Sequence, residues 1–142
     1  TENGRDIASI RARWFAGFGK LERTCVLPSH RGTKAVRVLL AHACEVAARK
    51  GYRVMLAQIQ ARLWPTWQAV LNCELRTHRP GFSFSDFDYL EMEIPLAPHP
   101  DAITIEADPY LIIRPEGAWD EAGVLDRSVA RSAPLIQKDR AA

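Results

Sequence analysis

The sequence predicts an α/β domain in which helices pack on a mixed β-sheet. Segments with the two-residue periodicity of strands alternate with segments that have the 3.6-residue periodicity of helices. A strand, a helix and a second strand follow one another between residues 21 and 59, and this order makes the two strands parallel. The 142 residues, 47% of them hydrophobic, are enough for one folded domain with one core.

The first predicted element is an antiparallel hairpin. Residues 8–15 alternate apolar and basic side chains, as a half-buried strand does. Gly17 and Gly19 give the backbone the freedom that a tight turn needs. The second strand, residues 21–27, ends at Pro28 because proline has no N–H to donate to the ladder.

A helix over residues 35–50 has the clearest pattern in the chain. Its apolar residues recur at helical spacing, and Gly51 follows as a left-handed cap. Residues 52–59 are almost continuously apolar, which is typical of a strand buried on both faces. A second helix is predicted over residues 65–72, because Pro65 suits a first helical turn.

The C-terminal third is predicted to begin with strands. A short polar strand at 74–79 precedes a half-buried antiparallel strand at 87–96, after which several prolines mark a boundary. We therefore expect a core at 1–96 and a C-terminal extension at 97–142. Four elements are predicted in the extension: strands at 102–106 and 110–113, a short helix within 118–129, and a mobile tail at 132–142.

Charge is distributed unevenly along the chain. Residues 1–80 hold 14 Lys or Arg against 5 Asp or Glu, whereas residues 81–142 hold 5 against 12. The basic half predicts an anionic ligand such as a phosphate, although mutual attraction of the two halves explains the pattern equally well. The acidic second half and the lack of a recognised motif argue against a nucleic-acid partner.

Other features narrow the class of protein. No apolar run reaches the length of a membrane span, so no membrane partner is expected. Three cysteines without a close pair indicate reduced thiols and predict a cytoplasmic protein. His42 and Cys44 point to different faces of the helix at 35–50, so no metal site is expected.

A basic loop lies between the second strand of the hairpin and the long helix. Arg31, Gly32, Thr33 and Lys34 precede the first turn, where unpaired N–H groups and the helix dipole attract anions. The loop is therefore a candidate pyrophosphate site, in which Arg31 and Lys34 line one pocket. The alternative is that the loop only connects the strand to the helix and that its charged side chains are solvated.

The residues around this loop resemble those of the GNAT superfamily, the acyl-CoA-dependent N-acyltransferases. The family motif has a strand E-x-x-x-V-x-P, then a residue pair, then R-G, then a helix that contains L-L. In this chain the motif is matched in order by Glu22, Val26, Pro28, Arg31–Gly32 and Leu39–Leu40. The resemblance covers residues 8–96 and implies a GNAT-like mixed sheet without the usual N-terminal strand and two helices.

The resemblance implies that a small-molecule amine attacks the thioester of acetyl-CoA or another acyl-CoA. Glu22 would be the general base, unless it is a surface residue paired with Arg13 across the hairpin. The backbone N–H near Val26 would polarise the thioester oxygen.

Two departures from the family pattern leave a second function open. Lys34 and Val36 stand where the family's phosphate loop has small residues, and Gln68 stands where many members have a proton-donating Tyr. The alternative is a non-catalytic GNAT-like module for binding or assembly. Residues 23–26 are also similar to a strand of acyl-homoserine-lactone synthases, which implies acyl-carrier protein as another donor. An uncovered strand near Ala8 predicts a homo-oligomer or a longer parent chain.

Overall fold

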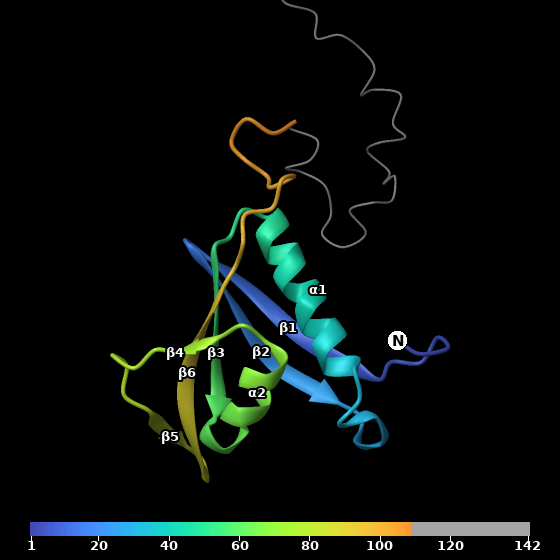
Figure 1. Ribbon diagram of the computed structural model, residues 1–142, viewed down its shortest axis with the longest axis vertical. Helices are drawn as coiled ribbons and strands as arrows, with labels where there is room; N and C mark the ends of the chain where they lie inside the picture. Colours follow the sequence, from blue (N-terminus) through green and yellow to red (C-terminus); the bar gives the residue numbers. More distant parts are fainter. Residues whose placement is uncertain (109–142) are drawn as a thin grey trace, which may run out of the picture. The chain divides into compact units, whose positions relative to one another are not determined.

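The strands of the chain form one mixed sheet, shown in the computed structural model in Figure 1. Among the described residues, 1–108, the sheet has six strands in the order β1–β2–β3–β6–β4, and β5 also pairs with β6. Their bounds are Ala8–Phe15 for β1, Phe18–Val26 for β2, Val54–Gln60 for β3, Glu74–Leu75 for β4, Phe82–Phe84 for β5 and Phe87–Pro95 for β6.

The predicted α/β topology is confirmed. Strands β1 and β2 form the antiparallel hairpin, and β2 and β3 are parallel because helix α1 (Ala35–Arg49) connects them. Strand β6 runs antiparallel to β3 and aligns with it from Val54↔Pro95 to Gln60↔Tyr89. The sequence analysis did not predict β5.

Both helices lie on the same face of the sheet, in front of it in Figure 1. We call this the covered face. Helix α2 (Trp64–Val70) packs Trp64 and Trp67 against the core, and α1 buries Leu40 completely. Alternate positions of the strands contribute six further core side chains: Leu21, Met55, Ala57, Ile59, Met92 and Ile94. Gly19 belongs to this face because a Cβ there would collide with the side chain of Met55.

The opposite face, which we call the open face, carries no helix within residues 1–108. The residues that alternate with the core positions point to it, as the period of two requires. They include basic residues on β1, Lys20 and Glu22 on β2, Leu56 and Gln58 on β3, and Glu91 and Glu93 on β6. One sheet therefore has an apolar face and a largely charged face.

Strand β2 contains a β-bulge. The register with β1 shifts between Ser9↔Cys25 and Arg11↔Glu22, so that β2 has one more residue in this interval than β1. The extra residue is taken up near Arg23, whose φ of 55° lies in the left-handed region. The bulge bends β2 directly before the motif residues Cys25 and Val26.

Two units divide the chain, Thr1–Ala102 and Ile103–Ala142. The predicted strand at 102–106 is wrong: residues 102–104 have no regular structure, and residues 105–106 form a turn in which the N–H of Ala107 donates to the carbonyl of Thr104. Alternating apolar residues cannot form a strand where no partner pairs with their backbone. The predicted elements at 110–113, 118–129 and 132–142 lie outside the described residues. No helix within residues 1–108 has the length and hydropathy required to cross a membrane.

Candidate functional site

A cleft opens where β2 and β3 separate. The two strands align at only three positions, Gly19↔Met55, Lys20↔Leu56 and Leu21↔Ala57. Beyond Leu21, β2 continues to Val26 with no pairing to β3. A cavity with a volume of about 410 Å³ lies beside this unpaired end of β2. It is lined by the end of β2, the basic loop, the start of α1, and the region of α2: Thr24, Cys25, Val26, His30, Arg31, Gly32, Val36, Leu63, Thr66 and Trp67.

The end of β2 directs the backbone groups of Val26 toward this cleft. The N–H of Leu27 donates to the carbonyl of Ile7, on the β1 side. Because successive residues of a strand direct their backbone groups to opposite sides, the N–H and carbonyl of Val26 point away from β1, into the cleft. The hydrogen bond from Arg31 Nε to the Val26 carbonyl, at 3.4 Å, agrees with this direction.

The loop before α1 contains backbone N–H groups that can donate hydrogen bonds to an anion. Gly32 turns the chain with a φ of 77°. Among residues 1–108, the N–H groups of Gly32 and Lys34 have no hydrogen-bond partner. Thr33 is engaged within the loop, because its hydroxyl donates to the carbonyl of His30 at 2.7 Å and accepts from the N–H of Ala35 at 3.2 Å. The predicted anion site therefore has its N–H groups, while the Thr33 side chain stabilises the loop.

Arg31 and Lys34 do not line one pocket, contrary to the sequence prediction. Arg31 and Gly32 line the cleft, whereas Thr33 and Lys34 line a neighbouring cavity of about 380 Å³ against the N-terminal segment. His30 lies between the two cavities and lines both. Gly32, with its positive φ, turns the chain between Arg31 and Lys34, so that these two side chains face different sides.

Glu22 lies on the open face, one residue beyond the last position paired between β2 and β3. Its carboxylate accepts a hydrogen bond from Arg11 Nε at 2.7 Å, and Arg13 and Lys20 lie within 3.8 Å. Partial burial raises the pKa of Glu22, but the hydrogen bond and charge of Arg11, with Lys20 and Arg13, lower it below the ordinary 4.5. Glu22 is therefore ionised at neutral pH and paired across the hairpin, chiefly with Arg11.

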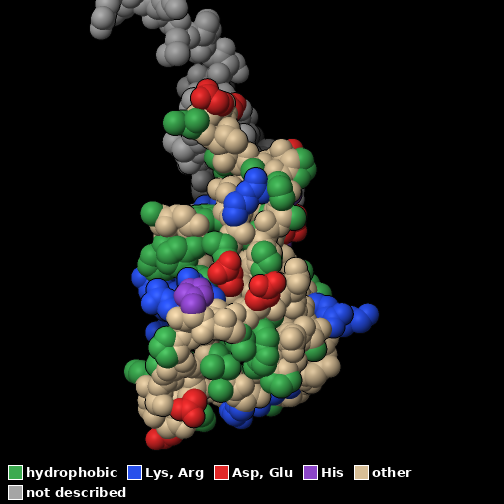
Figure 2. Space-filling view, turned by 60° about the vertical axis from the view of Figure 1, so that its left-hand side comes forward, with side chains coloured by type: hydrophobic (Ala, Val, Ile, Leu, Met, Phe, Trp, Pro, Cys, Tyr) green, Lys and Arg blue, Asp and Glu red, His purple; other side chains and the backbone are tan. Residues whose placement is uncertain are grey.

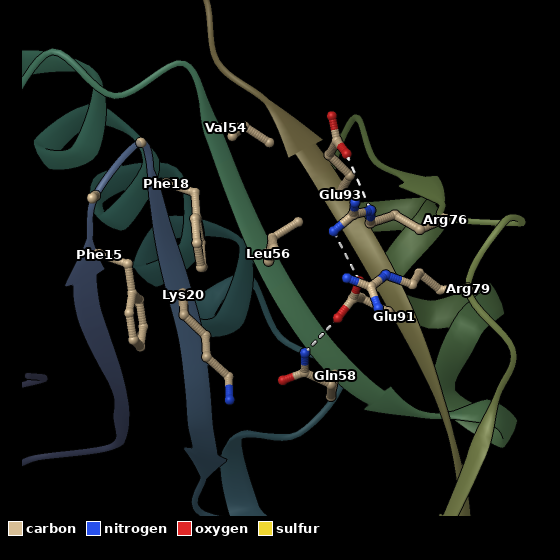
Figure 3. A pocket seen from close by; sticks show the side chains of 12 residues that line it. Phe15, Phe18, Lys20, Val54, Leu56, Gln58, Arg76, Arg79, Glu91 and Glu93 are labelled. Atoms are coloured by element: carbon tan, nitrogen blue, oxygen red, sulfur yellow. Dashed lines mark hydrogen bonds and ion pairs between the residues drawn. The ribbon is translucent and has the colours of Figure 1, made fainter.

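The open face contains a second hollow, of about 590 Å³, which we call the open-face hollow (Figure 3). Apolar side chains from the first hairpin and β3 lie at one side of it, and a charged group from β6 and the segment after β4 lies at the other. Its lining side chains are Phe15, Phe18, Lys20, Val54, Leu56, Gln58, Arg76, Arg79, Glu91 and Glu93, beside Ala16 and Gly17.

A hydrogen-bonded network orders the charged side of this hollow. Glu91 accepts from Gln58 Nε2 at 2.8 Å and from Arg76 at 2.9 Å. The buried Nε of Arg76 has no hydrogen-bond partner among the described residues and lies 3.6 Å from Glu93. Figure 2 shows the side of the molecule that bears β4–β6, where basic, histidine and acidic side chains lie next to one another.

The sequence did not single out the residues of the open-face hollow as a site. The alternation of apolar and polar residues in β6 predicted that Glu91 and Glu93 face away from the core. This alternation was the one sequence feature that pointed to the hollow. Arg76 and Arg79 come from a separate segment, which only the fold brings beside them. Within residues 1–108, no cluster of His, Cys, Asp and Glu side chains could hold a metal ion.

The comparisons with known proteins concern the fold. No protein-family model and no curated protein matches the sequence, whereas 89 chains of solved structures match. A Lactobacillus plantarum structure assigned as an N-acetyltransferase superposes with a TM-score of 0.59 at 17% identity, over 64% of this chain and 61% of the other.

Two further structures match in the same way. A Desulfovibrio desulfuricans protein assigned as an acetyltransferase of the GNAT family has a TM-score of 0.57 at 17% identity, over 68% of this chain and 65% of the other. A Salmonella typhimurium protein assigned as an acetyltransferase, solved with its cofactor acetyl-CoA, has a TM-score of 0.56 at 22% identity, over 70% and 63%. The part of the chain that superposes thus has the GNAT fold, and the chain spans less than two thirds of each of these three structures.

Proposed function

We propose that this chain provides the core of an N-acyltransferase, which moves an acyl group from acyl-CoA to a small-molecule amine. The observation that carries the proposal is the separation of β2 and β3 beside a basic loop in a GNAT fold. Because β2 is not paired with β3 beyond Leu21, a thioester in the cleft can reach the backbone N–H of Val26. The loop and the N-terminus of α1 offer donors to a pyrophosphate.

The donor would enter the cleft along β2. The N–H of Val26 points into the cleft and would donate to the donor's oxygen atoms, including that of the thioester. Arg31, together with the N–H group of Gly32, would bind the pyrophosphate. The Val36 side chain lines the cleft beside the loop, and contacts from Arg31 to the pyrophosphate would take the place of some contacts from backbone N–H groups.

The charge around the cleft favours an anionic donor. Residues 23–73 contain eight Lys or Arg residues and a single carboxylate, Glu45. They comprise the end of β2, the loop, α1, β3 and α2, which are the elements that surround the cleft. The same charge suits an acyl-carrier protein, and this remains the alternative donor.

The amine would approach from the open face. Glu22 and Gln58 lie on this face next to the point where β2 and β3 separate. The ionised Glu22 would attract a protonated amine and take one proton from it, and the neutral nitrogen would then attack the thioester carbon with its lone pair. The nitrogen would lose a second proton to solvent as the amide forms. The thiolate of CoA then leaves with the electron pair of the broken C–S bond.

A non-catalytic binding module is the second candidate. It is favoured by the three cations around Glu22, which lower its basicity, and by the exposed Gln68, which is not among the residues that line the cleft. Such a module would bind acyl-CoA without transferring the acyl group.

A titration separates these outcomes. Acetyl-CoA and longer acyl-CoAs are titrated into the full chain by calorimetry, and release of free CoA is followed with amine acceptors. We expect binding that weakens about tenfold in Arg31→Ala, the effect of losing one charge-assisted hydrogen bond. The matched Lys34→Ala, in the neighbouring cavity, loses a side chain outside the cleft and should change affinity less. Binding without CoA release supports the module, and no binding refutes both.

A further inference from the structure

We propose that the open-face hollow binds a zwitterion with an apolar side chain, that is, an apolar amino acid, and that this is the acceptor. The role as acceptor rests on the proposed function, whereas the binding itself does not. The inference starts from three groups of lining side chains: an apolar group, the carboxylates and Arg79. Figure 3 shows the apolar group at one side of the hollow and the charged groups at the other. Its volume of about 590 Å³ is within the range of small-molecule sites.

The apolar side is preformed. The rings of Phe15 and Phe18 stack with their centroids 5.0 Å apart, and Arg13 lies over Phe15 at 5.1 Å. Val54 and Leu56 continue this surface along β3. An aromatic or branched aliphatic group would be removed from water here.

The acidic group would bind the ammonium. Glu91 is held in one orientation by Gln58 and Arg76, and its side chain is 19% exposed. Glu93, 44% exposed, is held only by a longer contact with Arg76. Glu91, Glu93 and Arg76 together carry one net negative charge, which favours a cation beside the carboxylates, whereas Arg79 and Lys20 add positive charge to the lining.

Arg79 supplies the opposite charge. Its side chain has no hydrogen bond or ion pair within the described residues and lines the same hollow. Lys20 lines the hollow from β2 but already pairs with Glu22 at 3.7 Å. A carboxylate on the ligand would therefore pair with Arg79, and a ligand with both charges would satisfy both groups.

The position of the hollow is compatible with acyl transfer. Lys20 and Leu56 line it and also form a paired position of β2 and β3, next to the point where these strands separate. Gln58, the next open-face residue of β3, lines the hollow and holds Glu91. An amine bound beside Glu91 would therefore lie on the face from which the acceptor is proposed to approach.

The test measures binding without any acyl donor. L-phenylalanine, 2-phenylethylamine and 3-phenylpropanoate are titrated separately into the full chain, by ligand-observed NMR. These ligands share a ring and differ in which charge they lack. We expect L-phenylalanine to bind about fivefold more tightly than either single-charge ligand, because exposed charge pairs contribute up to about this factor.

Variants assign the binding to the hollow. Arg79→Gln should lower the affinity for L-phenylalanine about fivefold and leave that for 2-phenylethylamine unchanged. Arg5→Gln is the matched control, since Arg5 lies in the N-terminal turn away from the lining residues. Equal affinities for the three ligands, an unaffected Arg79→Gln, or no binding overturns the inference. If the chain binds acyl-CoA but no amino acid, this inference is refuted and the proposed acyltransferase function stands. If the chain binds the amino acid but no acyl-CoA, only the proposed acyltransferase function is refuted.

Discussion

The covered face and the open face of the sheet are built from the same strands but by different physics. On the covered face, Leu40, Met55 and Met92 are completely buried, and helices exclude water from them. On the open face, side chains at the alternate positions carry charges that neutralise one another in pairs and networks. Burial of apolar area accounts for most of the stability of a domain, whereas exposed ion pairs contribute little. The comparison indicates that the covered face holds the fold and the open face is available for function.

The largest expected effect compares the same substitution on the two faces. Leu40→Ala should destabilise the domain by about 2–5 kcal/mol, because it leaves a cavity in the core. Leu56→Ala on the open face should cost about 1 kcal/mol or less, because water can fill the space. Urea denaturation measures both values. Equal losses would mean that the open face is covered in solution.

The next effect concerns catalysis. If Glu22 accepts the amine proton, Glu22→Gln should lower kcat about 10²-fold, the usual contribution of a general base. It should leave the affinity for acyl-CoA unchanged, since the cleft is on the other side of β2. The control is Glu45→Gln, an exposed carboxylate on α1. Full activity in Glu22→Gln would leave Glu22 a purely structural ion-pair partner.

A smaller effect is expected on stability in acid. The pKa of Glu22 is lowered in the folded chain, so its ionised form stabilises the fold above the ordinary value of 4.5. This contribution is lost as the pH falls below 4.5 through the lowered pKa. Denaturation of Glu22→Gln between pH 7 and pH 3 should therefore show a shallower loss of stability than the parent. Parallel curves would contradict the proposed pairing with Arg11.

The smallest effect is a difference in thiol reactivity that requires no mutation. Cys25 is exposed in the cleft, whereas burial raises the pKa of both Cys44 and Cys73. A thiol reagent at pH 8 should modify Cys25 first and the other two only as the chain unfolds. Acyl-CoA in the cleft should slow the reaction of Cys25. Mass spectrometry of digested samples measures the order, and early labelling of Cys73 would contradict the closed core.

Most of the fold was predictable because its signals are local. The stripe of α1, the alternation of β1 and β6, and the cap at Gly51 each depend on spacing within one segment. The same spacing placed Val26, Arg31 and Gly32 together, and all three line the cleft. The prediction of a strand at 102–106 was wrong because a strand needs a partner strand, and the local sequence does not show whether one is present.

The sequence by itself determined the order of elements, the apolar face of each, and the basic loop before α1. Only the tertiary structure decided that Arg31 and Lys34 face different cavities, and that Arg11, rather than Arg13, is the chief partner of Glu22. It also decided that Arg76 joins Glu91 and Gln58 beside two stacked aromatic rings. The physical reason is that periodicity fixes which side of a segment is buried. Bulges, turns and the separation of strands fix where individual side chains meet, and they depend on contacts between distant segments.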